Sequence, residues 1–147
     1  MYDRNKIKGL ILHLIKECEK GSEKMTITKL YKLLYFIEFG HYAMFGEAVL
    51  GLTFIKLPYG PVPYIIDKFL EAYETSEMIN KLPDNTGYFP KQVYKTNIQV
   101  GYDELKEEYG FTESEISVIH STLEEFGGEK AKTASNESHY HHSWLGR

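Results

Sequence analysis

Residues 27–45 read ITKLYKLLYFIEFGHYAMF, and this stretch decides the fold. At about 100° per residue, a helix through it collects one long stripe of apolar side chains with one histidine. The stripe consists of Ile27, Leu30, Leu34, Ile37, His41 and Phe45. Thr26 can cap the start of this helix, and Gly46 can end it. A helix that is apolar around so much of its circumference is expected to lie at the centre of a domain or to offer a surface to another molecule.

Helical periodicity recurs on both sides of this segment. Apolar residues from Ile7 to Cys18 follow helical spacing, and Gly21 is a suitable C-terminal stop. Residues 62–73 and 112–126 also have apolar stripes, the latter behind a capping box formed by Thr112 and Glu115. A short last helix is expected within residues 133–147. The acidic run DELKEEY (103–109) is interpreted as a solvated helix face.

Two segments have the pattern of strands. AVLGLTFIK (48–56) is rich in aromatic and β-branched residues, and VYKTNIQV (93–100) alternates at period two, so the two are expected to pair. Between them, KLPYGPVP (56–63) is predicted to be a rigid corner from strand to helix, with Pro63 as the first helical residue. KLPDNTGYFP (81–90) is predicted to be a loop.

These elements predict an α+β fold that is mostly helical, with about five helices around the central apolar helix and one small two-stranded sheet. A chain of 147 residues is expected to form a single domain, residues 1–147. Because the apolar stripes of the helices must meet in one core, seven side chains are expected to be buried together. They are Leu30, Leu34, Ile37, Ile66, Phe69, Ile119 and Leu123.

Composition narrows the location and the partners. The net charge of −4 does not favour nucleic acid or an anionic membrane. A lone cysteine, Cys18, is typical of a reducing compartment, so a cytoplasmic location is expected. No apolar run is long enough to cross a bilayer, and the start MYDRNKIKG lacks the features of a signal peptide. Aromatic residues make up 14% of the chain and must fill a core or an interface.

Candidate catalytic groups are few. His139, His141 and His142 could bind a metal with Cys18, His13 or His41, but their spacing does not place ligands on one helix face. His41 lies on the apolar stripe, where a hydrogen-bonded core histidine is expected. His120 is expected to be exposed. No nucleophile motif or phosphate-binding glycine loop occurs, so neither an enzyme nor a cofactor is expected. The alternative is a small metal- or nucleotide-dependent enzyme that uses His41 and His139.

Three motifs point to a known family. The first is LYKLLYFIEFGHYAMFG, with Leu30, Lys32, Leu33, Leu34, Tyr35, Phe36, His41, Tyr42 and Gly46 at the family's positions. The second is Tyr59, Gly60, Pro61 and Val62, and the third is Ser138, His139 and Trp144. In order and spacing these motifs resemble the SocA-like, Panacea-domain antitoxins, which include phage-associated relatives. The chain departs from the family pattern at Ser143, where a proline is expected.

The resemblance implies a mostly helical domain that neutralises a protein toxin, encoded by a neighbouring gene, by direct binding. For some relatives it further implies delivery of the toxin to a cytosolic protease. Other relatives carry an extra DNA-binding domain, for which the segment before Thr26 is too short, so direct binding of nucleic acid is not expected. A phage adaptor that binds a partner other than a toxin is a further alternative.

Four tyrosines are the candidate partner-binding residues. Tyr31, Tyr35 and Tyr42 lie within about 40° of one another around the helix axis, beside the core stripe. Tyr59 lies on the proline-rich bend, which would hold its ring in place at little entropic cost. Tyrosine suits the edge of a core as well as a partner surface. Both interpretations stay open at this point.

Overall fold

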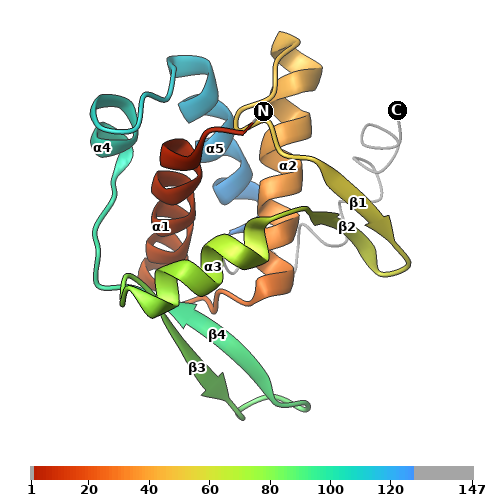
Figure 1. Ribbon diagram of the computed structural model, residues 1–147, viewed down its shortest axis with the longest axis vertical. Helices are drawn as coiled ribbons and strands as arrows, with labels where there is room; N and C mark the ends of the chain where they lie inside the picture. The colour runs from red at the N-terminus through yellow and green to blue at the C-terminus, as the bar shows by residue number, and fades with distance from the viewer. Residues whose placement is uncertain (1, 128–147) are drawn as a thin grey trace.

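The computed structural model describes residues 2–127, which form helices α1, α2, α3, α4 and α5 and two β-hairpins (Figure 1). In chain order the elements are α1 (Arg4–Lys20), α2 (Ile27–Phe45), β1 (Phe54–Leu57), β2 (Gly60–Pro63), α3 (Ile66–Thr75), β3 (Asn80–Asp84), β4 (Lys91–Lys95), α4 (Tyr102–Glu107) and α5 (Glu113–Phe126). The predicted class, α+β and mostly helical, is confirmed. Most of the DELKEEY run lies in α4, as expected.

The core lies between α1, α2 and α5, with α2 in contact with both of the other helices (Figure 1). Five of the seven predicted core residues, Leu30, Leu34, Ile37, Ile66 and Ile119, have no exposed surface. Phe69 and Leu123 are partly buried and pack against this cluster. The prediction that the helical stripes meet in one core is therefore confirmed.

The apolar stripe of α2 is buried in its middle and exposed at its ends. Thr26 caps the helix by accepting a hydrogen bond from the backbone N–H of Lys29, and Gly46 ends it with a φ of 77°. Ile27 and Phe45, at the two ends, are 37% and 48% exposed. The ends of the stripe therefore extend beyond the packed core, and apolar periodicity alone does not show where packing stops.

The proline-rich stretch is not a corner from strand to helix, and that prediction was wrong. It forms a β-hairpin, with Leu57 paired with Gly60 across a turn at Pro58 and Tyr59. Proline suits the first corner of such a turn, and Gly60 has a φ of 127°, which other residues rarely adopt. Pro63 ends β2 and does not start a helix.

Helix α3 begins after an unusual joint. Ile65 precedes its first residue with a φ of 80°, a left-handed conformation that is costly for a β-branched side chain. Ile65 lies between the end of β2 at Pro63 and the start of α3 at Ile66. The predicted helix over residues 62–73 therefore exists, but it starts at Ile66, and Val62 belongs to the hairpin.

The second sheet also corrects the prediction. Residues 80–84 and 91–95 pair as an antiparallel hairpin, so the start of the expected loop is a strand. Strand β4 does not pair with β1, and each hairpin is a separate two-stranded sheet. The backbone N–H of Tyr94 donates to the carbonyl of Met25, which ties this hairpin to the chain just before α2.

Some expectations fall outside the described residues. They are the short last helix within residues 133–147 and the positions of Ser138, His139, His141, His142, Ser143 and Trp144. Within residues 2–127, no helix combines the length and the apolar character needed to span a bilayer.

Candidate functional site

An aromatic groove lies between the first half of α2 and the β1–β2 hairpin. It encloses about 520 Å³. Its lining comes from Ile27, Thr28, Tyr31, Lys32, Tyr35 and Phe36 of α2 and from Tyr59, Gly60, Pro61 and Val62 of the hairpin. We call these residues the tyrosine groove. It joins two segments that both belong to motifs singled out in the sequence.

The helix and the hairpin position the three tyrosines of this groove differently. Tyr31 and Tyr35 are one turn apart on α2 and are half-buried, whereas Tyr59 lies at the hairpin turn and is 83% exposed. Burial, followed by the nearby Asp67, raises the pKa of Tyr31 to about 12. Its hydroxyl therefore stays protonated at physiological pH and can donate a hydrogen bond to a partner.

Tyr42 does not belong to the groove. It lies in the last half of α2, is 59% exposed and is absent from the lining. The structure thus brings together Tyr31, Tyr35 and Tyr59, and leaves Tyr42 on a separate stretch of the same helix. The helical angle predicts the three α2 tyrosines on one flank, but Tyr42 lies about two turns beyond Tyr35, and only Tyr31 and Tyr35 of the three line the groove.

Aromatic contacts extend the groove toward the outer strand of the hairpin. The ring of Tyr35 lies 4.7 Å from that of Phe39 and 5.5 Å from that of Phe54, centroid to centroid. Phe39 and Phe54 are also 5.5 Å apart, and Phe39 is 43% exposed. These three rings hold β1 against α2 while leaving apolar surface open to solvent.

Lys32 supplies the charge of the groove. It is the charged residue among the lining side chains, and its ammonium group lies 5.4 Å from the ring centre of Phe126 and 6.0 Å from that of Phe36. Those two rings stack at 4.3 Å with 11° between their planes. The stacked rings therefore join α2 to α5. Lys32, beside these rings, places a positive charge at the edge of the tyrosine groove.

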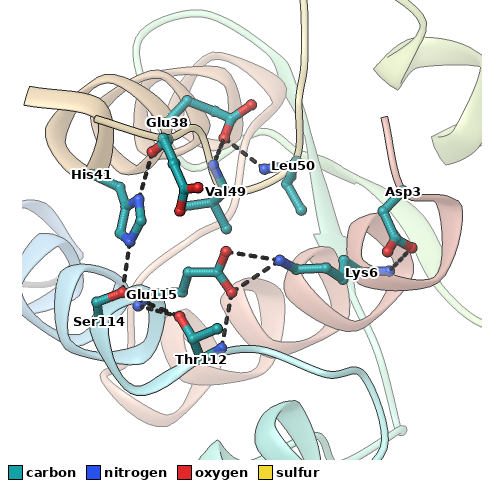
Figure 2. Close-up of polar contacts among 10 residues, drawn as sticks. Asp3, Lys6, Glu38, His41, Val49, Leu50, Thr112, Ser114 and Glu115 are labelled. Carbon is teal, nitrogen blue, oxygen red and sulfur yellow. Dashed lines mark hydrogen bonds and ion pairs between the residues drawn. The ribbon is translucent and has the colours of Figure 1, made fainter. Parts of the chain in front are cut away.

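A buried carboxylate anchors the loop that leads into the hairpin (Figure 2). One Glu38 oxygen, Oε1, accepts hydrogen bonds from the backbone N–H groups of Val49 and Leu50 at 2.6 and 2.7 Å. The other, Oε2, accepts one from Leu52 at 2.7 Å. Glu38 is only 3% exposed. Glu38 is not among the residues predicted from the sequence, although it is the acidic residue of a largely apolar helix and a buried carboxylate needs partners.

His41 is a hydrogen-bonded core histidine, as expected from the sequence. Its Nδ1 donates to the backbone carbonyl of Glu47 at 2.6 Å, and its Nε2 accepts from the hydroxyl of Ser114 at 2.9 Å (Figure 2). Its side chain is 2% exposed. Through these two hydrogen bonds, His41 connects the end of α2 to the start of α5.

The first helix is held to α5 by a partly buried ion pair. The ammonium group of Lys6 contacts both Glu115 carboxylate oxygens at 2.9 Å (Figure 2). The same carboxylate accepts from the backbone N–H of Thr112, which confirms the predicted capping box. This arrangement fixes the scaffold behind the groove. It lies away from the groove lining.

The remaining candidate groups have structural surroundings. Burial raises the pKa of the Cys18 thiol to about 11, so it is a poor nucleophile at neutral pH. His13 is fully buried, with Nδ1 2.6 Å from the carbonyl oxygen of Val100. His120 is exposed, as expected. Among residues 2–127, no three His, Cys, Asp or Glu side chains are arranged to hold a metal ion.

Fold and groove together define a small α+β domain of mostly helical structure with an open aromatic surface. The family model of the antitoxin SocA-like proteins with a Panacea domain matches residues 30–145. The chain belongs to this family. No curated protein and no solved structure matches it.

Proposed function

We propose that this protein is an antitoxin that neutralises a cognate protein toxin by binding it directly. Membership of the SocA-like antitoxin family supports a protein partner. The observation that carries the proposal is the tyrosine groove, which juxtaposes two family motifs, KLLYF on α2 and YGPV on the hairpin. Large half-buried aromatic side chains around a hollow are typical of the energetic centre of a protein interface.

Tyr31, Tyr35 and Tyr59 would form the centre of the toxin-binding surface, with Tyr42 as a more distant contact. Lys32 would add one positive charge at the rim. Gly60 and Pro61 shape the hairpin and thereby position Tyr59. The family motif residues Leu33, Leu34, Phe36 and His41 are buried and would act by holding α2 in place. His139 and Trp144 complete the motif outside the described residues.

The protein would act in the cytoplasm, as one domain over residues 1–147, without catalysis of its own and without a cofactor. The environment of His41 supports a non-enzymatic role, because a histidine with both nitrogens occupied is poorly placed to exchange protons with a substrate. Delivery of the toxin to a cytosolic protease would be a further step of the same function.

Co-expression tests the proposal directly. The protein encoded beside this gene is induced alone and together with this chain, and growth is followed. We expect growth arrest by the neighbouring protein alone, rescue by this chain and co-purification of the two proteins. Rescue in a strain lacking the major cytosolic proteases would show that binding alone suffices. A neighbouring protein that is not toxic, or that is toxic and not rescued, would contradict the proposal.

A further inference from the structure

The two edges of the β1–β2 hairpin differ in their ability to accept another strand. The backbone N–H of Tyr64 donates to the carbonyl of Thr53 at 2.7 Å. Thr53 and Tyr64 are therefore a hydrogen-bonded pair. In an antiparallel ladder such pairs alternate with pairs that are not hydrogen-bonded to each other, so Ile55 with Val62 and Leu57 with Gly60 are the next bonded pairs. The pairs between them, Phe54 with Pro63 and Lys56 with Pro61, turn their backbone groups outward.

On the β2 side this outward edge is blocked. Its outward positions are Pro61 and Pro63, which have no N–H to donate, and β2 lies against α2 (Figure 1). Prolines at these positions are a common way to prevent pairing along a sheet edge. An incoming strand would find carbonyl oxygens here and no donors.

Within the described part of the chain, the outer edge of β1 is unpaired. Phe54 and Lys56 each direct an N–H and a C=O outward, and none of these four groups has a hydrogen-bond partner within residues 2–127. Lys56 and its neighbour Ile55 are exposed, Ile55 by 45%. Donor and acceptor groups at i and i+2 match the backbone of an extended chain.

We propose that the toxin docks by adding a β-strand to the outer edge of β1. This inference rests on the proposed function for the identity of the partner. The strand would carry an apolar side chain opposite Phe54, where it would also cover the exposed ring of Phe39. Two residues further along the incoming strand, on the same face, a carboxylate side chain would lie opposite Lys56.

Charge favours a toxin strand over a second copy of this chain. Lys56 is the charged residue of the segment 48–66, and it forms no ion pair within the described part of the chain. A copy of the same hairpin would bring no carboxylate to it, because residues 48–66 contain neither Asp nor Glu. An acidic strand supplies the missing partner.

A matched pair of variants tests the backbone contact. Lys56→Pro removes the outward N–H together with the charge, whereas Lys56→Ala removes only the charge. Neither change breaks a bond within the hairpin. We expect Lys56→Pro to bind the toxin identified by growth rescue about tenfold more weakly than Lys56→Ala. Equal affinities of the two variants would overturn the proposal, provided that the Ile55 amide remains protected from exchange in both.

Amide hydrogen exchange gives a second readout on the unmodified protein. In the free protein the amides of Phe54 and Lys56 should exchange fast, while those of Ile55 and Leu57 are protected. Toxin binding should slow Phe54 and Lys56 by about tenfold or more. Protection in the free protein that rises with its concentration, together with a dimer in light scattering, would show that a second copy occupies the edge and would overturn the proposal.

Failure of the proposed function can be separated from failure of this inference. If the neighbouring protein does not bind, a displayed library of random twelve-residue peptides is selected on the wild-type protein and counter-selected on the Lys56→Pro variant. Acidic peptides retained by the wild type and released by the variant would support an open edge with a partner other than that protein. Peptides that bind both proteins equally would overturn it.

Discussion

The imidazole of His41 joins α2 to α5 through a 2.9 Å hydrogen bond with the hydroxyl of Ser114. Its other nitrogen holds the carbonyl of Glu47, just beyond the end of α2. One side chain thereby connects the end of α2, the start of α5 and the loop toward the hairpin.

Replacement of His41 should reduce stability. His41→Ala would remove the hydrogen bonds to the Glu47 carbonyl and the Ser114 hydroxyl and leave a small cavity, and we expect a loss of about 2–4 kcal/mol in the free energy of unfolding by urea. The control is Ser121→Ala on the exposed surface of α5, which should change stability by less than about 0.5 kcal/mol. A His41→Ala protein that keeps the wild-type free energy of unfolding but no longer neutralises the toxin would instead support the enzyme alternative.

Glu38 should be needed for the folded position of residues 49–52. Glu38→Gln weakens three charge-assisted hydrogen bonds, because an amide can turn only one acceptor oxygen toward the backbone donors. We expect a loss of about 2–3 kcal/mol in unfolding free energy, measured by urea denaturation. Glu107→Gln, at an exposed position of α4, is the matched control. Equal effects of the two changes would argue against the anchoring role.

His13 should make stability fall at mildly acidic pH. Burial lowers the pKa of His13 in the folded protein, so the unfolded chain, with a pKa near 6.5, binds the proton more readily. This contribution to stability is complete above about pH 6.5 and is lost as the pH falls toward the lower folded pKa, with a slope of at most about 1.4 kcal/mol per pH unit.

The contribution of His13 is isolated by comparison with His13→Leu across pH 7.5 to 5. Denaturation curves of this variant should lack that part of the slope, whatever its stability at neutral pH. Parallel pH profiles of the two proteins would show that His13 is not responsible for the loss of stability in acid.

Single replacements of the four tyrosines by alanine should distinguish the rings that bind the toxin from those that support the fold. Tyr59→Ala should weaken toxin binding by about 2 kcal/mol, or about 30-fold, with little change in thermal stability, because this ring is 83% exposed. Tyr31→Ala and Tyr35→Ala should reduce both quantities, since these rings are half-buried. Tyr42→Ala should have the smallest effect on binding.

Binding by calorimetry and melting by circular dichroism, on the same four proteins, decide between the two roles. If affinity falls only in variants that also melt at markedly lower temperature, the tyrosines are part of the core edge and the toxin binds elsewhere. Loss of affinity in Tyr59→Ala alone would move the centre of the interface to the hairpin.

Gly60 should not tolerate a side chain. Its φ of 127° is strained for alanine, so Gly60→Ala should destabilise the hairpin by about 1–3 kcal/mol and weaken toxin binding. Gly21→Ala is the control, because its φ is −85° and an added Cβ there would meet only ordinary contacts. Hydrogen exchange of the Ile55 amide would report the local loss in Gly60→Ala.

The sequence predicted the helices well because their signals are local. Caps at Thr26 and Thr112 and an apolar period of 3.6 mark helix starts and buried faces without reference to the rest of the chain. The hairpins were missed because their signals are not local. The prolines of residues 56–63 are compatible with a corner between strand and helix and also with a strand whose edge cannot pair. Which of the two forms depends on the strand that each segment pairs with.

The groove was predictable only in part. The angular position of Tyr31 and Tyr35 follows from sequence, and so does the motif that contains Tyr59. Their proximity depends on the fold of the hairpin against α2, which no spacing rule supplies. Glu38 was missed for a related reason, since its partners are backbone groups, which every residue possesses.

That last property has a consequence for the loop itself. Glu38 accepts hydrogen bonds from the main-chain N–H groups of Val49, Leu50 and Leu52, so these bonds do not depend on which side chains the three positions carry. A change of side chain at these positions, other than to proline, leaves the three hydrogen bonds in place, but Val49 and Leu50 are buried in the core and must stay apolar. The loop before the hairpin is therefore held in two ways, by main-chain hydrogen bonds to Glu38 and by the packing of its own apolar side chains.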